Sequence, residues 1–182
     1  RIDADGYLWL TGRAKDLIIR GGHNIDPTMI EETLRRHKSV LLVAAVSKPD
    51  AYAGELPVAY VQLVKDSHTT GEEIIEFVRQ HITERAAVPK EVYVLDEMPL
   101  TDVGKPSKVH LRHDAARRAF AAALSDAIPE QTFDVSVAAD ATHGTSATIA
   151  LSAPSAQRDA LENRIHEVMK AFTMHHAVRW HA

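Results

Sequence analysis

Strand-like and helix-like patterns of apolar residues alternate through the first two thirds of the chain. Residues 40–46 and 58–64 are rich in valine, and the segment 48–57 between them contains two prolines and a glycine. The pattern predicts two strands joined by an irregular loop. Residues 92–95 predict one more short strand.

Two shorter apolar runs, 7–10 and 16–20, lie close to the start of the sequence. They predict a pair of strands, with the connection 12–15 between them. This places Lys15 on a connecting segment, where its simplest role is that of an exposed charge.

Helical spacing of apolar residues follows two capping signals. Asp26 and Pro27 have the pattern of an N-cap and a first helical residue, which predicts a helix from Pro27 to about His37. Thr70 and Glu73 form a capping-box pattern in front of a second amphipathic helix.

A third helix is expected to begin after Ser107, acting as its N-cap, and to run to about Phe120. The elements up to this point predict a compact α+β unit, which we call the first unit. The alanine-rich segment 121–131 then reaches Pro129, and we interpret it as a helix tail that breaks into a linker.

The tail, defined as residues 132–182, has a different order of elements. Residues 133–137 and 146–152 each alternate between apolar and polar positions, with turn residues between them, and so predict a hairpin. An amphipathic helix follows Pro154, and residues 176–180 predict a last strand, giving ββαβ.

So small a unit has little core of its own, and we expect one face of its sheet to be covered by the first unit or by a second copy of the tail. Self-association is the preferred hypothesis, because two-fold pairing is common among soluble chains. We therefore divide the chain into a domain at 1–120, a linker at 121–131 and an appendage at 132–182 without a catalytic group.

Composition narrows the function classes. The 182 residues are 45% hydrophobic and 25% charged, as in ordinary globular proteins. A net charge of −4 argues against a nucleic-acid binder. The absence of cysteine excludes disulfides, cysteine metal sites and a thiol nucleophile, and is consistent with a cytoplasmic location. No apolar run approaches the length of a membrane span.

Eleven histidines raise the question of a metal site. His110 and His113 are spaced i, i+3 without neighbouring carboxylates, and His175, His176 and His181 lie on a predicted strand or at the terminus. We therefore expect no metal site.

The segment PLTDVGKPSK, residues 99–108, is the most informative in the chain. Gly104 can adopt a positive φ, and Pro99 and Pro106 stiffen the flanks, so Lys105 is expected at the tip of a defined loop. In isolation it would be a solvated loop lysine. Its ammonium is also suited to the negative charge that gathers when a carboxylate reacts with a phosphate.

Read with GRAKDLIIRGGHNIDPTMIE, residues 12–31, this loop resembles the C-terminal lid domain of the acyl-adenylate-forming superfamily, specifically of its AMP-forming acyl-CoA synthetases. The resemblance covers about residues 1–120. The chain opens on Arg1 in the middle of the family pattern, so we expect it to be a fragment of a longer protein, with the ATP-binding signature and the acyl pocket upstream.

The resemblance implies roles for particular residues. Lys105 would be the catalytic lysine of the adenylation half-reaction, and Lys15 would be the hinge about which the lid rotates. Gly21, Gly22 and Asn24 would belong to the pantetheine tunnel for CoA; a tight turn before the helix at Asp26 also explains the glycines, and both interpretations can hold together. Asn24 matches the Gly-Gly-x-Asn-Ile form of acyl-CoA ligases.

Other charged residues have two interpretations each. Arg13 matches the family arginine near the adenylate ribose and phosphate, or is a surface salt-bridge partner. Glu31 and Glu32 are interpreted as structural acids that complement the first turn of a helix. Several basic residues either contact the phosphates of CoA or form a solvated helix face: Lys90, Lys108, Arg112, Arg117 and Arg118. Pro106 departs from the usual motif, which puts the local geometry of Lys105 in question.

The resemblance implies the C-terminal domain of an ATP-dependent carboxylic acid–CoA ligase that uses ATP, Mg²⁺ and CoA, mostly bound by its own N-terminal domain. The lid would supply the adenylation lysine and, after rotation, part of the CoA tunnel. Two alternatives stay open at this point: the lid of an acyl-AMP ligase that loads a carrier protein, and a non-catalytic interaction module.

Overall fold

The computed structural model describes residues 4–7 and 13–181, and it has the expected α+β architecture. The first unit holds the strands β1 (Ile18–Arg20), β2 (His23–Ile25), β3 (Val40–Asp50), β4 (Gly54–Leu63) and β5 (Glu91–Leu95). Its helices are α1 (Pro27–Arg35), α2 (Gly71–His81) and the start of α3 (Lys108–Ala127). No helix in the part of the chain that is described is long and apolar enough to cross a membrane.

Strand β4 lies at the centre of the first sheet. It pairs antiparallel with β3 along its length and parallel with β5 over residues 58–62, and Arg20 of β1 joins it at Gly54. The loop predicted at 48–57 is wrong, because β3 and β4 continue as a hairpin to a turn at 51–53. The prolines of this segment, Pro49 and Pro57, lie outside the stretch that β4 shares with β5. There each strand needs N–H donors toward only one neighbouring strand, so the prolines are tolerated.

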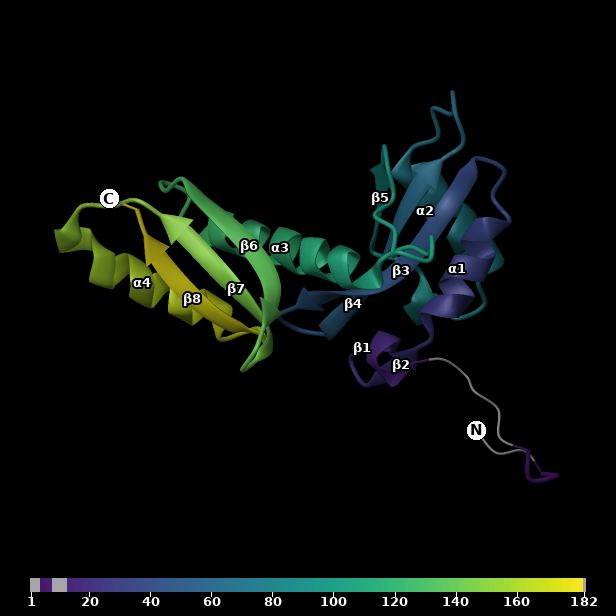
Figure 1. The fold of residues 1–182 in the computed structure, drawn as a ribbon, viewed down its shortest axis with the longest axis horizontal. Coiled ribbons are helices and arrows are strands. Elements are labelled where there is room, and N and C mark those ends of the chain that lie inside the picture. The colour runs from purple at the N-terminus through teal and green to yellow at the C-terminus, as the bar shows by residue number, and fades with distance from the viewer. Residues whose placement is uncertain (1–3, 8–12, 182) are drawn as a thin grey trace.

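Helices cover both faces of this sheet (Figure 1). Alternate residues of β3 point to opposite sides, so that Val43 and Ala45 pack with α1 and α2, whereas Ala44 and Val46 pack with α3. Each fully buried valine, leucine or isoleucine of these two layers contributes about 1.5–3 kcal/mol, and the alanines contribute less, so the layers together fix the sheet between its helices.

Two of the three predicted N-caps form as expected at the starts of their helices. Asp26 accepts a hydrogen bond from the Thr28 N–H at 2.9 Å, and Thr70 and Glu73 form the complete capping box. Ser107 occupies the N-cap position of α3, but its hydroxyl pairs with His110 Nδ1 at 2.7 Å instead of capping the backbone.

Helix α2 approaches β5 unusually closely at its first residue. A Cβ atom added to Gly71 would lie 2.5 Å from the carbonyl oxygen of Val92, closer than real contacts permit. Glycine is therefore the residue that allows α2 to lie against β5 at this point.

The chain enters β1 through a short turn. Residues 8–12, with most of the strand expected at 7–10, lie outside the described residues. Lys15 lies in a short 3₁₀ turn, Ala14–Asp16, and the expected strand at 16–20 is reduced to β1.

The tail has the predicted ββαβ order. Its strands are β6 (Phe133–Asp140), β7 (Gly144–Leu151) and β8 (His175–Trp180), and α4 (Ser155–Met169) connects β7 to β8. The sheet order is β6-β7-β8, with β6 and β7 antiparallel and β7 and β8 parallel.

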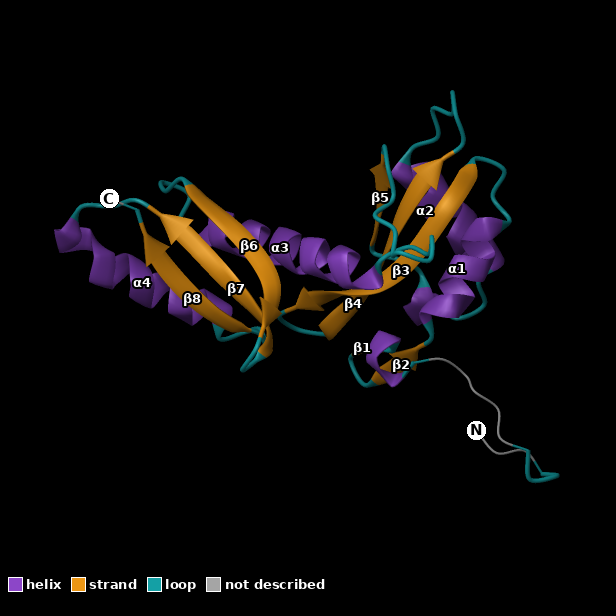
Figure 2. Ribbon diagram, viewed as in Figure 1, coloured by secondary structure: helices purple, strands orange, loops and turns teal. Residues whose placement is uncertain are grey.

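Helix α3 runs to Ala127 and not to about Phe120, so the segment 121–131, interpreted as a helix tail that breaks into a linker, is helical as far as residue 127. Leu111 and Ala115 pack in the core of the first unit, whereas Phe120, Leu124 and Ile128 pack against the tail sheet together with α4. Figure 2 shows α3 reaching from the first unit to the tail. The apolar face of the tail sheet is therefore covered within one chain, without a second copy.

Candidate functional site

Residues 99–108, which we call the lysine loop, form the predicted loop. Gly104 has φ +74°, and a bridge between Leu100 and Pro106 closes the loop. Thr101 N–H donates to the Lys105 carbonyl at 2.7 Å, and Gly104 N–H donates to the Thr101 carbonyl at 2.8 Å. These bonds hold the backbone of Lys105, while its side chain is exposed.

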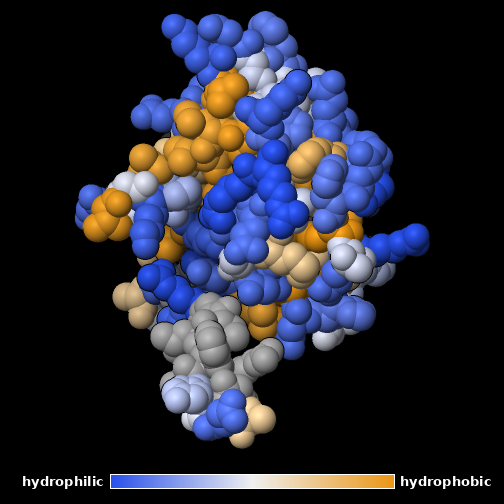
Figure 3. Space-filling view, turned by 90° about the vertical axis from the view of Figure 1, so that its right-hand side faces the viewer, coloured by the Kyte–Doolittle hydropathy of each residue, from blue (hydrophilic) through white to orange (hydrophobic). Residues whose placement is uncertain are grey.

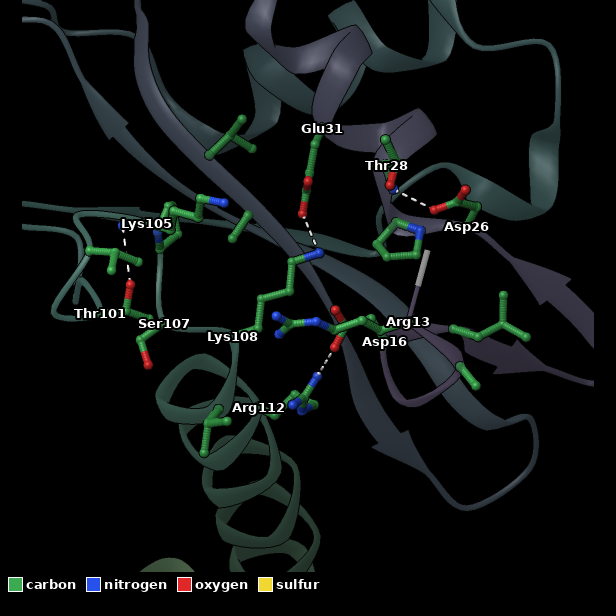
Figure 4. A pocket seen from close by; sticks show the side chains of 18 of the residues that line it. Arg13, Asp16, Asp26, Thr28, Glu31, Thr101, Lys105, Ser107, Lys108 and Arg112 are labelled. Carbon is green, nitrogen blue, oxygen red and sulfur yellow. Dashed lines mark hydrogen bonds and ion pairs between the residues drawn. The ribbon is translucent and has the colours of Figure 1, made fainter. Parts of the chain in front are cut away.

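Lys105 lines an open cleft of about 1100 Å³. The 3₁₀ turn and the start of α1 form one wall, and the lysine loop with the start of α3 forms the other (Figure 4). The charged side chains that line it are Arg13, Asp16, Asp26, Glu31, Arg35, Lys105, Lys108 and Arg112.

Glu31 joins the walls of the cleft at their base. Its carboxylate accepts the Ala45 N–H at 2.9 Å and pairs with Lys108 Nζ at 2.7 Å, and the residue is only 7% exposed. A structural role for Glu31 thus agrees with the contacts, but the expected reason is wrong, because Glu31 lies beyond the first turn of α1. The ion pair with Lys108 was not foreseen from the sequence.

Asp16 forms the second tie across the cleft. It accepts a hydrogen bond from Arg112 at 2.8 Å, which links the 3₁₀ turn that carries Lys15 to α3 (Figure 4). Sequence reasoning did not single out Asp16, and a separation of 96 residues gives no local signal for the pair.

Two basic side chains of the cleft, those of Lys105 and Arg13, have no acidic partner among the described residues. Within the ranges 4–7 and 13–181, neither Lys105 nor Arg13 forms an ion pair, in contrast to Lys108 and Arg112. Both side chains lie in the cleft (Figure 4). An anionic ligand between them would therefore meet positive charge without having to displace a carboxylate.

Gly21, Gly22 and Asn24 lie on the hairpin formed by β1 and β2 and do not line this cleft. Gly21 and Gly22 have φ of +53° and +85°, and an added Cβ at either would meet nothing within 4 Å. Their conformation requires glycine for the turn, and the space beside them is open.

The five basic residues considered for the CoA phosphates do not form a single face. Lys90 lies at a separate groove beside Arg20, Glu72 and Arg79. Arg117 and Arg118 both pair with Asp114, at 2.7 and 2.6 Å. Only Lys108 and Arg112 lie in the Lys105 cleft.

Asp114 forms a polar cluster at the middle of α3. Burial tends to raise the pKa of its carboxyl, but hydrogen bonds from Arg118, Arg117 and Tyr60 outweigh this and lower the pKa. Burial, followed by the contact with Asp114, raises the pKa of Tyr60. The cluster belongs to the fold, because Tyr60 is buried in the core beneath α3.

The described residues contain no group of three or more histidines and acids suited to a metal ion. The tail histidines pair instead: His166 Nδ1 lies 2.6 Å from His176 Nε2, and the rings of His143 and His175 stack at 3.7 Å. No sequence pattern predicted either pair.

Apolar side chains reach the surface near the lysine loop. Val103 is 78% exposed, and Leu100 and Val109 are each about half exposed. Figure 3, which views the first-unit end of the molecule, shows apolar surface between hydrophilic side chains.

Part of the first unit matches a known family. Residues 29–105 match the model of the AMP-binding enzyme C-terminal domain. The chain is 45% identical over 168 residues to marinolic acid–CoA ligase of Pseudoalteromonas sp. (strain SANK 73390), which covers 92% of this chain and 26% of the relative. It is 35% identical over 119 residues to medium-chain fatty-acid–CoA ligase of Escherichia coli (strain K12), covering 65% of this chain and 21% of the relative.

Solved structures give the same result for the first unit. ATP-bound MatB from Rhodopseudomonas palustris superposes with a TM-score of 0.59 at 28% identity, covering 65% of this chain and 24% of that one. A fatty acyl-CoA synthetase of Mycobacterium tuberculosis gives 0.53 at 33% identity, with 62% and 22% covered. The amide bond synthetase McbA from Marinactinospora thermotolerans gives 0.51 at 34% identity, with 61% and 22% covered. The chain spans about a quarter or less of the length of these relatives.

Proposed function

Because this chain carries an AMP-binding enzyme C-terminal domain of the kind found in acyl-CoA ligases, we propose that it is the mobile lid of an ATP-dependent, AMP-forming acyl-CoA synthetase. The observation that carries the proposal is the uncompensated ammonium of Lys105, whose backbone is held by hydrogen bonds within its loop and whose side chain faces an open cleft. The rest of the active site would belong to an N-terminal adenylate-forming domain, for which the exposed Leu100, Val103 and Val109 provide a contact surface.

The reaction has two halves. In the first, a carboxylate oxygen of the substrate attacks the α-phosphorus of ATP, pyrophosphate leaves, and acyl-AMP forms. In the second, the CoA thiolate attacks the acyl carbon and AMP leaves. Lys105 and Arg13 suit the first half, because the carboxylate and the α-phosphate gather negative charge where these cations lie. ATP and its Mg²⁺ would be held mostly by the N-terminal domain.

The second half requires the lid to rotate. Lys15 in its 3₁₀ turn is the proposed hinge, and Gly21, Gly22 and Asn24 on the β1–β2 hairpin are the proposed wall of the CoA tunnel. The open space beside both glycines supports this assignment, because a thin ligand can pass there close to the backbone. Lys108 and Arg112 could contact the phosphates of CoA only while keeping their ion pairs with Glu31 and Asp16.

We keep the domain division at 1–120, 121–131 and 132–182 as part of the proposal, with α3 crossing the first boundary. The cytoplasmic location and a carboxylic acid substrate also belong to the proposal.

A second candidate acceptor is a nucleophile other than CoA, such as the phosphopantetheine thiol of a carrier protein. The similarity to an amide bond synthetase favours keeping it, because that relative shares the lid fold. Adding CoA or a holo-carrier protein to preformed acyl-AMP distinguishes the two by which one consumes it. A non-catalytic interaction module would predict a gene without an upstream adenylate-forming domain.

The lid assignment is tested in the full-length enzyme by measuring the two half-reactions separately. Lys105→Ala should slow acyl-AMP formation by about a hundredfold to a thousandfold, the usual cost of one oriented electrostatic contact, and leave CoA transfer from supplied acyl-AMP nearly unchanged. Lys65→Ala, which removes an exposed lysine away from the cleft, is the matched control. Equal losses in both half-reactions would contradict the role of Lys105.

A further inference from the structure

The tail sheet has one covered and one open face. Helices α3 and α4 pack on the face that carries Val135, Ile149 and Val178 (Figure 2). Directly paired residues of neighbouring strands point to the same side of a sheet, so the alternate positions form the open face. Asp134, Ala150 and Arg179 make one row of that face, and Ser136, Thr148 and Ala177 make the next.

The first row places opposite charges at the two edges of the sheet. Asp134 lies on β6 and Arg179 on β8, and both are exposed. Neither forms an ion pair with another residue of the described part of the chain. Between them lies Ala150, and the second row is also small, so no large side chain stands above the middle of the face.

This arrangement is complementary to itself. A two-fold axis parallel to β7, midway between two sheets that face each other, exchanges the two edge strands. It places Asp134 of one copy opposite the partner's Arg179, and the symmetry repeats the pair at the other edge. The small central residues allow the sheets to approach to the ordinary spacing of about 10 Å.

We propose that a second copy of this chain docks on the open face of the tail sheet, with its strands aligned and two Asp134–Arg179 pairs at the edges. The proposal is independent of the ligase function. Stable interfaces use about 20–30 residues a side, and this three-stranded face offers fewer. The dimer is therefore weak, dependent on concentration and weakened by salt.

The test is a charge swap in the 182-residue chain, followed by sedimentation over a concentration series at low salt. Asp134→Arg and Arg179→Asp should each raise the dimer dissociation constant by about tenfold or more, because each creates two pairs of like charges. The double variant should return it close to that of the wild type, since the pairs form again with reversed polarity.

Asp159→Arg makes the same charge change as Asp134→Arg at an exposed position of α4, away from the open face, and should leave the dissociation constant unchanged. Ala150→Glu places a long charged side chain at the middle of the face and should abolish the dimer. Thermal unfolding at low concentration checks that each variant folds. A chain that stays monomeric at the highest concentration, a dimer that tolerates Ala150→Glu, or a double variant that is not restored would each overturn the proposal.

Discussion

Ala115 and Ala116 are neighbours in α3, yet Ala115 packs in the core of the first unit and Ala116 packs in the core of the tail. The helix passes from one core to the other without a break. A truncation after Pro129 would therefore leave Phe120 and Leu124 without their cover, so the tail is not an appendage that can be removed cleanly.

The two cores should lose stability separately. Phe120→Ala should destabilise the tail by about 3–5 kcal/mol, and Leu111→Ala should destabilise the first unit by about 2–5 kcal/mol, because each creates a cavity in a different core. Hydrogen exchange should show lost protection in β6–β8 for the first variant and in β3–β5 for the second. Loss spread equally over both sheets in both variants would contradict two separate cores.

The adjacent acids Glu31 and Glu32 should differ sharply in their effect on stability. Glu31→Ala should cost about 1–3 kcal/mol, because it leaves the buried Ala45 N–H without an acceptor and removes the partner of the partly exposed Lys108. Glu31→Gln keeps an acceptor and should cost less. Glu32→Ala, at an exposed position, should change the free energy of unfolding by less than about 0.5 kcal/mol. Urea titration of the three variants measures these differences.

Asp114 should make the stability of the chain depend on acid pH. Its lowered pKa means that its contribution is full above the unfolded-state pKa, near 3.9, and is lost as the pH falls through the folded-state value. Asp114→Asn should therefore be less stable than the wild type at pH 6, and the gap should narrow toward pH 3. A gap that stays constant over this range would show that the cluster with Arg117, Arg118 and Tyr60 does not stabilise the charged carboxylate.

Changes at the hinge and tunnel should affect the opposite half-reaction from Lys105→Ala. Lys15→Pro fixes φ at the proposed hinge, and Gly22→Leu fills the open space beside the β1–β2 turn, so both should slow CoA transfer more than acyl-AMP formation in the full-length enzyme. The positive φ of Gly22 strains any side chain, so Gly22→Ala is the control for backbone strain. If alanine impairs transfer as strongly as leucine, blockage of the tunnel is not the cause.

Local signals in the sequence predicted the elements that depend on local chemistry. The capping box at Thr70 and the alternation of β6 and β7 required no distant contact to be recognised, and both predictions were confirmed. The predicted end of α3, at about Phe120, was wrong because contacts with the tail hold residues 121–127 in the helix, and no local pattern reveals those contacts. The prediction of a loop at 48–57 was wrong because the pairing of β4 with β3 overrides the effect of the prolines.

The same distinction applies to the candidate site. The conformation of the Lys105 loop follows from Gly104 and its flanking prolines, which act within a few residues. The pairs Glu31–Lys108 and Asp16–Arg112 join residues far apart in the chain, so only the folded structure identifies which cations are already compensated.

The close contact between Gly71 and Val92 has a consequence for distant substitutions. Strand β5, which contains Val92, is the last regular element before the lysine loop. A single methyl group at residue 71 would have to push that strand aside, and we expect the loop that follows β5, which carries Lys105, to shift with it. The position of Lys105 in the cleft therefore depends in part on the absence of a side chain at residue 71.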